Sequence, residues 1–375
     1  MGQTIVAGTE GMRKLIPALA RRGYEVIGPV VRDGAIVYGH VEKIEDLPAG
    51  WTARLGPGSY RLAKRDDGAL FGYAAGPKSL KSFLHPPETT LFTAERDNGT
   101  FRVIQPPLET PRYAFLGVRA CELAAMERQD RVLLGDRYAD AIYESRRKGV
   151  FLVAVNCTAP AATCFCASMG AGPEAVSGFD LVITEITAPD RHELLVASGT
   201  PAGAEVLAEL EGREAPAATV KEAGEMLQAA GQAMRRAVET QGLKETLYAN
   251  FEHPEWERVA ARCLACGNCT SVCPTCFCVT VEDSTDVSVR HAERRRTWDS
   301  CFTLNFTYIH GGSVRPSVKA RYRQWLTHKF AAWQDQFGAS GCVGCGRCIA
   351  WCPAGIDVTE ELTAICRAPG APAMS

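Results

Sequence analysis

A cysteine pattern that occurs twice in the second half of the chain constrains the fold most strongly. The pattern Cys-x2-Cys-x2-Cys-x3-Cys-Pro occupies residues 263–274 and recurs at residues 342–353. Three thiolates spaced by two residues can bind three corners of one iron–sulfur cube, and the fourth, which precedes proline, points toward a second cube. Because both copies keep all four cysteines and the proline, a pair of zinc sites is a poor alternative. The sequence therefore predicts a two-cluster, ferredoxin-like domain.

In this arrangement each motif supplies three ligands to its own cluster and one ligand to the other cluster. Gly267 and Gly346 allow the backbone to turn tightly around the inorganic core. The expected cofactors are thus two [4Fe-4S] clusters. Cluster A is expected to be bound by Cys263, Cys266, Cys269 and Cys352. Cluster B is expected to be bound by Cys342, Cys345, Cys348 and Cys273.

The two motifs are separated by a long insertion, unlike those of short two-cluster ferredoxins. Within it, residues 290–329 carry nine Arg or Lys residues against Glu293 and Asp299. Neighbouring cations could stabilise a reduced cluster, which becomes more negative as it gains electrons. A solvated charged face, or a docking surface for an acidic partner, is equally compatible with this composition.

Four further cysteines are predicted to meet at one edge of an α/β sheet. Residues 113–118 and 150–155 are apolar runs of strand length, with helix formers between them. If these strands are parallel, Cys121 and Cys157 lie at their carboxyl edge, where α/β folds place ligands. A third iron–sulfur cluster and buried free thiols are both open interpretations. The four thiols of this possible third site are Cys121, Cys157, Cys164 and Cys166.

A second repeat suggests a different location for an additional site. The sequence Thr-Cys-Phe-Cys occurs at residues 163–166 and again at residues 275–278. If these two loops face each other, thiols of the insertion would complete a site between domains. The candidate ligands, less favoured than the set above, are Cys276, Cys278 and Cys301. Cys366 is expected to be a spare thiol.

The expected fold class is α+β. An N-terminal α/β domain with a mixed sheet would precede a mostly helical, two-cluster ferredoxin-like domain with a long insertion. Expected local elements are a helix over 11–22, hairpins around Asp33-Gly34 and Asp66-Asp67-Gly68, and a long helix from Thr219 to Gly242. The expected boundaries are 1–200 for the N-terminal domain, 201–250 for a linker and long helix, 251–367 for the ferredoxin-like domain and 368–375 for a loose tail.

The remaining sequence indicates an electron relay without a catalytic centre of its own. It contains no G-x-G-x-x-G after a predicted strand, no P-loop and no H-E-x-x-H pair. With 41 basic and 43 acidic residues, no global positive field favours nucleic acid. No apolar run is long enough to span a bilayer. The 16 cysteines, without a secretory signal, indicate a cytoplasmic metalloprotein rather than a disulfide scaffold.

Several segments together resemble a known family. They are residues 119–123, 156–173, 263–278, 298–302 and 342–353. These segments resemble the iron–sulfur β subunit of cytosolic multimeric nickel–iron hydrogenases of the sulfhydrogenase type, and the A subunit of anaerobic sulfite reductase is similar in the same places. The two Thr-Cys-Phe-Cys loops and Trp298-Asp299-Ser300-Cys301 make this resemblance more specific than the twin motif alone. The proline usual after Arg119 is Ala120 here, which affects only the local turn.

This resemblance implies an electron-transfer subunit of an oxidoreductase complex. Such a subunit passes electrons between a flavin subunit, which handles NAD(P)H or ferredoxin, and a catalytic subunit that holds nickel–iron or sirohaem. The flavin, nicotinamide and catalytic metal sites would then lie on other chains. Two alternatives to a hydrogenase subunit stay open, namely the A subunit of an anaerobic sulfite reductase and a stand-alone ferredoxin-like carrier.

Overall fold

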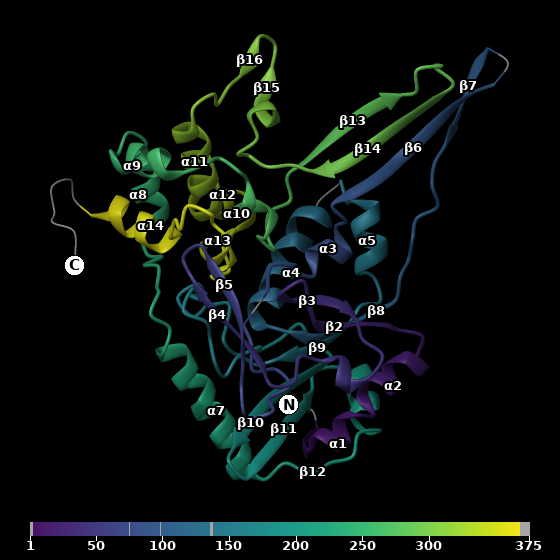
Figure 1. Cartoon of the computed structure of the whole chain (residues 1–375), viewed down its shortest axis with the longest axis vertical. Helices are drawn as coiled ribbons and strands as arrows, with labels where there is room; N and C mark the ends of the chain where they lie inside the picture. The colour runs from purple at the N-terminus through teal and green to yellow at the C-terminus, as the bar shows by residue number, and fades with distance from the viewer. Residues whose placement is uncertain (1–2, 75, 98, 136–137, 368–375) are drawn as a thin grey trace.

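The chain folds around an eight-stranded mixed sheet in the order β12-β1-β11-β10-β9-β8-β2-β3 (Figure 1). The computed structural model describes residues 3–74, 76–97, 99–135 and 138–367. Neighbouring strands from β2 to β10 are parallel, which confirms the pairing predicted for β8 and β9. The strands are β1 (Thr4–Ala7), β2 (Glu25–Arg32), β3 (Ala35–His40), β8 (Tyr113–Val118), β9 (Phe151–Val155), β10 (Leu181–Ala188), β11 (Arg191–Ser198) and β12 (Arg213–Glu214).

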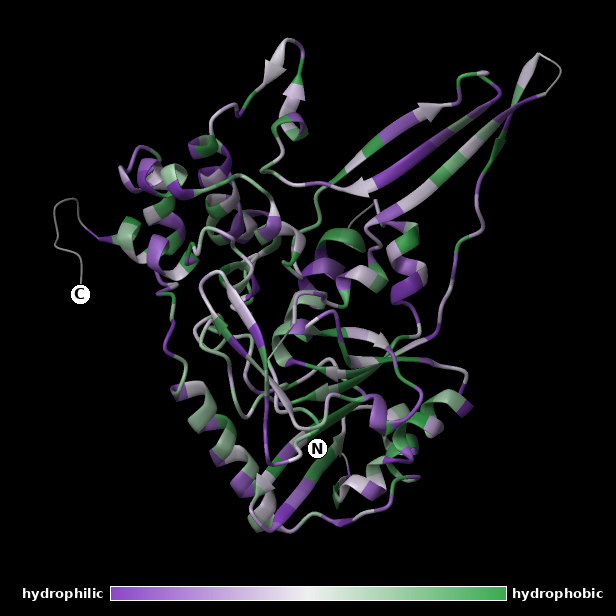
Figure 2. Cartoon of the chain, viewed as in Figure 1, coloured by the Kyte–Doolittle hydropathy of each residue, from purple (hydrophilic) through white to green (hydrophobic). Residues whose placement is uncertain are grey.

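Helices cover both faces of this sheet, so its central strands are apolar throughout (Figure 2). Leu116 faces a core that includes residues of α1, α2 and α6. Its neighbour Phe115 faces the opposite core, formed with α3, α4 and α5, as the two-residue period of a strand requires. The helices are α1 (Thr9–Met12), α2 (Leu15–Arg21), α3 (Lys81–Leu84), α4 (Ala120–Leu133), α5 (Ala141–Arg147), α6 (Pro201–Leu207) and α7 (Ala217–Gln232).

The last third of the chain packs around a separate aromatic core. Trp256, Phe302, Trp325 and Phe330 are buried in it, and so is Phe165 from the N-terminal half. Its α-helices are α8 (Leu243–Ala249), α9 (Glu255–Arg262), α10 (Asn268–Ser271), α11 (Val318–Thr327), α12 (Trp333–Phe337), α13 (Arg347–Ala350) and α14 (Val358–Cys366). A π-helical segment, η3 (His328–Ala332), joins α11 to α12. No helix in the described part of the chain combines the length and the apolar character needed to cross a bilayer.

The insertion between the cysteine motifs contributes strands as well as helices. Its hairpin of β13 (Val279–Thr285) and β14 (His291–Trp298) pairs with β6 (Glu88–Asp97) and β7 (Thr100–Ile104). This antiparallel sheet extends away from the rest of the molecule, at the upper right of Figure 1. The insertion is therefore tied to the N-terminal half by backbone hydrogen bonds. Two smaller hairpins are β4 (Trp51–Gly56) with β5 (Ser59–Lys64), and β15 (Tyr308–Ile309) with β16 (Gly312–Ser313).

Three local predictions need correction. The hairpin predicted around Asp66-Asp67-Gly68 is wrong, because β4 and β5 turn at Pro57-Gly58, where Gly58 has a φ of +64°. The helix predicted over 11–22 is divided into α1 and α2. The helix predicted from Thr219 to Gly242 begins at Ala217 and ends at Gln232.

Tertiary contacts explain why the last of these helices is shorter than predicted. Val238 lies beyond its end and is buried beside Phe165 in the aromatic core, and the Val238 N–H donates a 3.0 Å hydrogen bond to Ser168 Oγ. Residues just before α7, expected to form a linker, include Val206 of α6, which is fully buried. The domain boundaries stay a prediction, and the tail expected at 368–375 lies outside the described residues.

A buried ion pair connects the two halves of the chain. Arg347, the first residue of α13, pairs with Glu122 in the first turn of α4, and both side chains are 1% exposed. Arg347 Nε also donates a 2.7 Å hydrogen bond to the Gly76 carbonyl oxygen. Glu122 Oε2 accepts a 3.1 Å hydrogen bond from the Leu80 N–H. This network fixes the second cysteine motif against α4 and the loop before α3.

We expect Glu122→Gln and Arg347→Met each to destabilise the protein by about 3–5 kcal/mol, because either change leaves one charge buried without its partner. The double variant should lose less than the sum of the two, with a coupling energy of about 0.5–3 kcal/mol. Thermal unfolding of the anaerobic wild-type protein, the two single variants and the double variant measures these differences in stability. As a control, Glu10→Gln breaks an exposed pair with Arg13 and should cost less than about 1 kcal/mol. Strict additivity of the two buried changes would contradict the prediction.

Candidate metal centres

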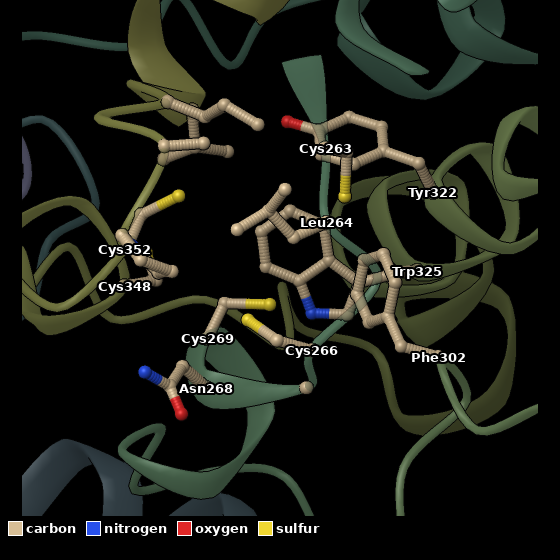
Figure 3. Close-up of a pocket in the computed structure, with 15 residues that line it drawn as sticks. Cys263, Leu264, Cys266, Asn268, Cys269, Phe302, Tyr322, Trp325, Cys348 and Cys352 are labelled. Carbon is tan, nitrogen blue, oxygen red and sulfur yellow. The ribbon is translucent and has the colours of Figure 1, made fainter. Parts of the chain in front are cut away.

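The first cysteine motif and the end of the second line one cavity. α9 ends at Arg262, directly before the first thiol, Cys263, and Gly267 (φ +75°) turns the backbone into α10. In Figure 3 the sulfur atoms of Cys263, Cys266, Cys269 and Cys352 point toward a common space. All four thiols predicted for cluster A thus lie on the same cavity, and Cys348 lines it as well.

Large apolar side chains form the other wall of the cluster A cavity. Phe302, Tyr322 and Trp325 lie on the same side as Cys263 and across the cavity from Cys348 and Cys352 (Figure 3). Burial raises the pKa of Cys269 well above its usual value, and the nearby Cys301 adds to this shift. On the outer side, the Cys266 thiol is exposed and Leu264 is 67% exposed. A centre bound here would be shielded by aromatic rings on one side and close to the surface on the other.

The thiols predicted for cluster B are also neighbours. The charges of Cys342, Cys345 and Cys273 each act on the buried Cys348 thiol. Burial raises the pKa of Cys342 to about 12. The pKa of Cys273 is lowered, first by a hydrogen bond from Cys276 and also by the Lys329 ammonium group.

A buried lysine lies directly on this second group of thiols. Lys329 is 6% exposed, and its Nζ lies 3.4 Å from Cys273 Sγ. The same ammonium donates hydrogen bonds to Thr275 Oγ1 (3.0 Å) and to the Gly341 carbonyl oxygen (3.3 Å). Since a buried cation needs a nearby anion, this contact suits a thiolate-bound, negatively charged centre.

The sheet edge brings together the four thiols of the possible third site. Cys121 lies in the first turn of α4 after β8, and Cys157 follows β9. Both line one cavity with Cys164, Cys166 and Cys345. Arg119, which is 5% exposed, donates a 2.9 Å hydrogen bond from Nη1 to the Asn156 carbonyl oxygen and so joins the two strand ends. The edge predicted from strand order is therefore where the thiols meet.

The first Thr-Cys-Phe-Cys loop packs directly on the second cysteine motif. The Phe165 N–H donates a 2.8 Å hydrogen bond to the Gly344 carbonyl oxygen. Gly346 (φ +72°) approaches so closely that an added Cβ would lie 2.2 Å from the Thr163 carbonyl oxygen. Sequence reasoning identified Gly346 only as a tight turn and missed this contact, because nothing in the sequence says which backbone a glycine approaches.

The remaining thiols lie beside the two motifs. Cys276 and Cys278 line a second cavity that also contains Cys266 and Asp299, and Cys301 interacts electrostatically with Cys278. Cys366 is exposed at the last residue of α14. Among the described residues, no three Cys, His, Asp or Glu side chains converge as they would on a single metal ion.

Most of the cations in the basic segment 290–329 are paired with carboxylates instead of lying on a cysteine motif. This pairing favours the charged-face interpretation for those residues, and Lys329 differs from them because it is buried against Cys273. The pairs include Arg294 with Asp283 (2.6 Å), Arg295 with Glu88 (2.9 Å) and Lys319 with Glu257 (3.1 Å).

The donor chemistry fits iron–sulfur clusters. Cysteine thiolates are their usual protein ligands, and each of the first two thiol groups surrounds or adjoins a buried region. Sequence reasoning did not single out Arg347 or Lys81 as buried cations near the thiols. Of these two cations, only Arg347 has a position in the sequence that could have indicated a place near the thiols, because it lies inside the second motif.

We expect Cys352→Ser to remove cluster A alone and Cys348→Ser to remove cluster B, although both thiols line the cluster A cavity. Each variant should retain about half of the iron and acid-labile sulfide of the dicluster domain. Because metal binding contributes to the folding free energy of such a domain, both should also melt earlier. Cys366→Ser, at an exposed thiol, is the matched control and should change neither property. Iron loss from the control equal to that from Cys352→Ser would overturn the ligand assignment.

Comparison with known proteins agrees with this chemistry. The 4Fe-4S dicluster domain family matches residues 262–356, which contain both cysteine motifs. Sulfhydrogenase 2 subunit beta from Pyrococcus furiosus is 34% identical over 256 residues, covering 67% of this chain and 73% of that protein. No solved structure matches the chain. The resemblance found in the sequence is thus confirmed, and the chain belongs to the family of sulfhydrogenase β subunits, iron–sulfur proteins with an electron-transfer role.

Proposed function

We propose that this chain relays electrons inside a multisubunit nickel–iron hydrogenase. Its partners would be a flavin subunit that handles NAD(P)H or ferredoxin and the nickel–iron catalytic subunit. The observation that carries the proposal is the meeting of both cysteine motifs at the cluster A cavity, in a relative of a sulfhydrogenase β subunit. The hydrogenase proposal is preferred to sulfite reductase because that relative is named as a hydrogenase subunit.

Within this proposal, the ligands of the two clusters cross between the motifs. Cys352 of the second motif lines the cavity of the first. Cys273 of the first motif lies among the thiols of the second. This exchange is what the Cys-x3-Cys-Pro spacing predicts. When bound, the clusters supply one-electron redox chemistry, and the protein sets their surroundings with the aromatic wall and the Lys329 ammonium group.

A third [4Fe-4S] cluster would occupy the sheet edge. The support is the shared cavity of Cys121, Cys157, Cys164 and Cys166. Cys345 borders the same cavity, and the Cys164 Sγ lies 3.9 Å from the Cys345 carbonyl oxygen. A cluster there would adjoin cluster B, so the proposed order of the relay is sheet-edge cluster, cluster B, then cluster A.

The surface near cluster A suits the end of this relay. Cys266 and Leu264 are exposed, so a partner can approach the cluster closely at this point.

The proposed domain architecture, an α/β domain followed by a ferredoxin-like domain, is compatible with this electron relay. The many free thiols also favour a cytoplasmic location for the complex.

We expect the double variant Cys164→Ser with Cys166→Ser to lose about four irons and about four sulfides per chain, because two ligands of the sheet-edge cluster are gone. The dicluster domain should keep about eight irons. The test is iron and sulfide analysis with reductive titration by electron paramagnetic resonance on the full anaerobic chain. Equal iron and equal electron uptake in the wild-type and variant chains would show that no third cluster exists.

The relay itself is tested with the assembled complex. The anaerobically purified complex should couple hydrogen oxidation to reduction of NAD(P)+ or of ferredoxin. Cys352→Ser in this chain should abolish that coupling, because a missing cluster interrupts the chain of carriers. Hydrogen oxidation with an artificial dye that accepts electrons at the nickel–iron partner should persist. Coupling at the wild-type rate in the Cys352→Ser complex would refute the proposed relay.

A further inference from the structure

We propose a further iron–sulfur centre, separate from the three above, bound by the thiolates of Cys276, Cys278 and Cys301 and by the carboxylate of Asp299. These residues come from the two ends of the β13–β14 hairpin. The proposed site lies between the first cysteine motif and helix α3. It depends on the dicluster domain for its position but not on the sheet-edge cluster.

The hairpin brings Cys278, Asp299 and Cys301 close together, and Cys276 lies two residues before Cys278. Val279 of β13 pairs with Trp298 of β14, so the residues just outside the hairpin are adjacent. The Asp299 N–H donates a 2.9 Å hydrogen bond to the Cys278 carbonyl oxygen. The Asp299 carboxylate and a backbone hydrogen bond from Cys301 both act on the Cys278 thiol. Three potential ligands are thus held at the open end of one rigid ladder.

A cavity adjoins these ligands. Cys276, Cys278 and Asp299 line it, and its volume is about 280 Å³. The cavity at cluster A has a volume of about 30 Å³ on the same measure, so the cavity at the new site is the larger of the two. Cys266 of the first motif lines the same cavity. A centre in this position would therefore be a direct neighbour of cluster A.

The charge around the cavity calls for an anion. Lys81 is 6% exposed, and its Nζ lies 3.2 Å from the Cys276 carbonyl oxygen and 3.8 Å from the centre of the Trp298 ring. In the described part of the chain no carboxylate forms an ion pair with Lys81. The thiols whose charge acts on this ammonium are Cys276, Cys273 and Cys278.

A buried ammonium group without an anion is strongly unfavourable. Lys329 has its anion in the thiolates of cluster B, through Cys273. Lys81 contacts the Cys276 backbone and lines one cavity with Cys278 and Asp299, and the Cys273 thiol also acts on its charge. A cluster with thiolate and carboxylate ligands is anionic, so a cluster in this cavity would place further negative charge beside Lys81.

The first test is cluster content in the full anaerobic chain. The double variant Cys278→Ser with Cys301→Ser should lose about four irons and about four sulfides relative to wild type. The electron paramagnetic resonance signals of clusters A and B should remain in this variant. These signals are identified as the ones lost in Cys352→Ser and Cys348→Ser. Cys366→Ser is the matched control and should keep all iron. The proposal would be overturned if the double variant kept the wild-type iron content. It would also be overturned if the wild-type chain held one zinc ion that the double variant lacked.

A second test does not depend on deleting ligands. Lys81→Met removes the buried cation and should lower the midpoint potential of the signal that is lost in Cys278→Ser with Cys301→Ser, because the reduced and more negative state loses its stabilising charge. Its iron content should stay at the wild-type level. The control Lys78→Met changes an exposed lysine of the loop just before α3, which does not line the cavity, and should leave every potential unchanged. If the potential of that signal does not move in Lys81→Met, or if only the cluster B signal moves, the ammonium does not face the proposed centre and the proposal fails.

Discussion

The contact between Arg347 and Glu122 holds the second cysteine motif to the N-terminal sheet. Arg347 directly follows Gly346 in that motif, and Glu122 directly follows Cys121 at the start of α4. The pair therefore fixes two segments that each carry a candidate ligand. Because both side chains are fully removed from water, neither can lose its partner without a large cost. The hydrogen bond between Phe165 and Gly344 closes the same junction at a second point.

The electrostatics of the junction suit negatively charged centres. Burial raises the pKa of Cys164 to about 12, so this thiol is protonated near neutral pH when no metal is bound. A thiol of this kind must release its proton when it becomes a ligand, which links cluster binding to folding and to pH. Buried cations such as Lys329 and Arg347 lie beside the thiols and favour the thiolate form. The cost of burying charge is thus offset when an anionic cluster is present.

Local patterns predicted local structure well. The apolar runs at 113–118 and 150–155 became buried parallel strands, and the cysteine spacing placed Cys352 on the cavity of the first motif. Prediction failed where distant residues decide the outcome. Val238 left its expected helix to pack beside Phe165. The same limit applies to the candidate sites, because Lys81 lies in a four-residue helix whose sequence neighbours give no sign that its ammonium group lies over Trp298. Burial of a single charge depends on the final packing, so a sequence without its fold cannot reveal it.

The crossed arrangement of the motifs has a consequence for synthesis of the protein. The strands of the eight-stranded sheet lie within residues 4–214, so that sheet can form while the rest of the chain is still on the ribosome. Under the proposed ligand assignment, the first motif lacks its fourth thiol until Cys352 has been translated. Neither cube of the dicluster domain can therefore be closed before the second motif has been translated. Cluster delivery must follow synthesis of that motif, and a product terminated before residue 342 would carry a folded sheet beside open, unfilled thiols.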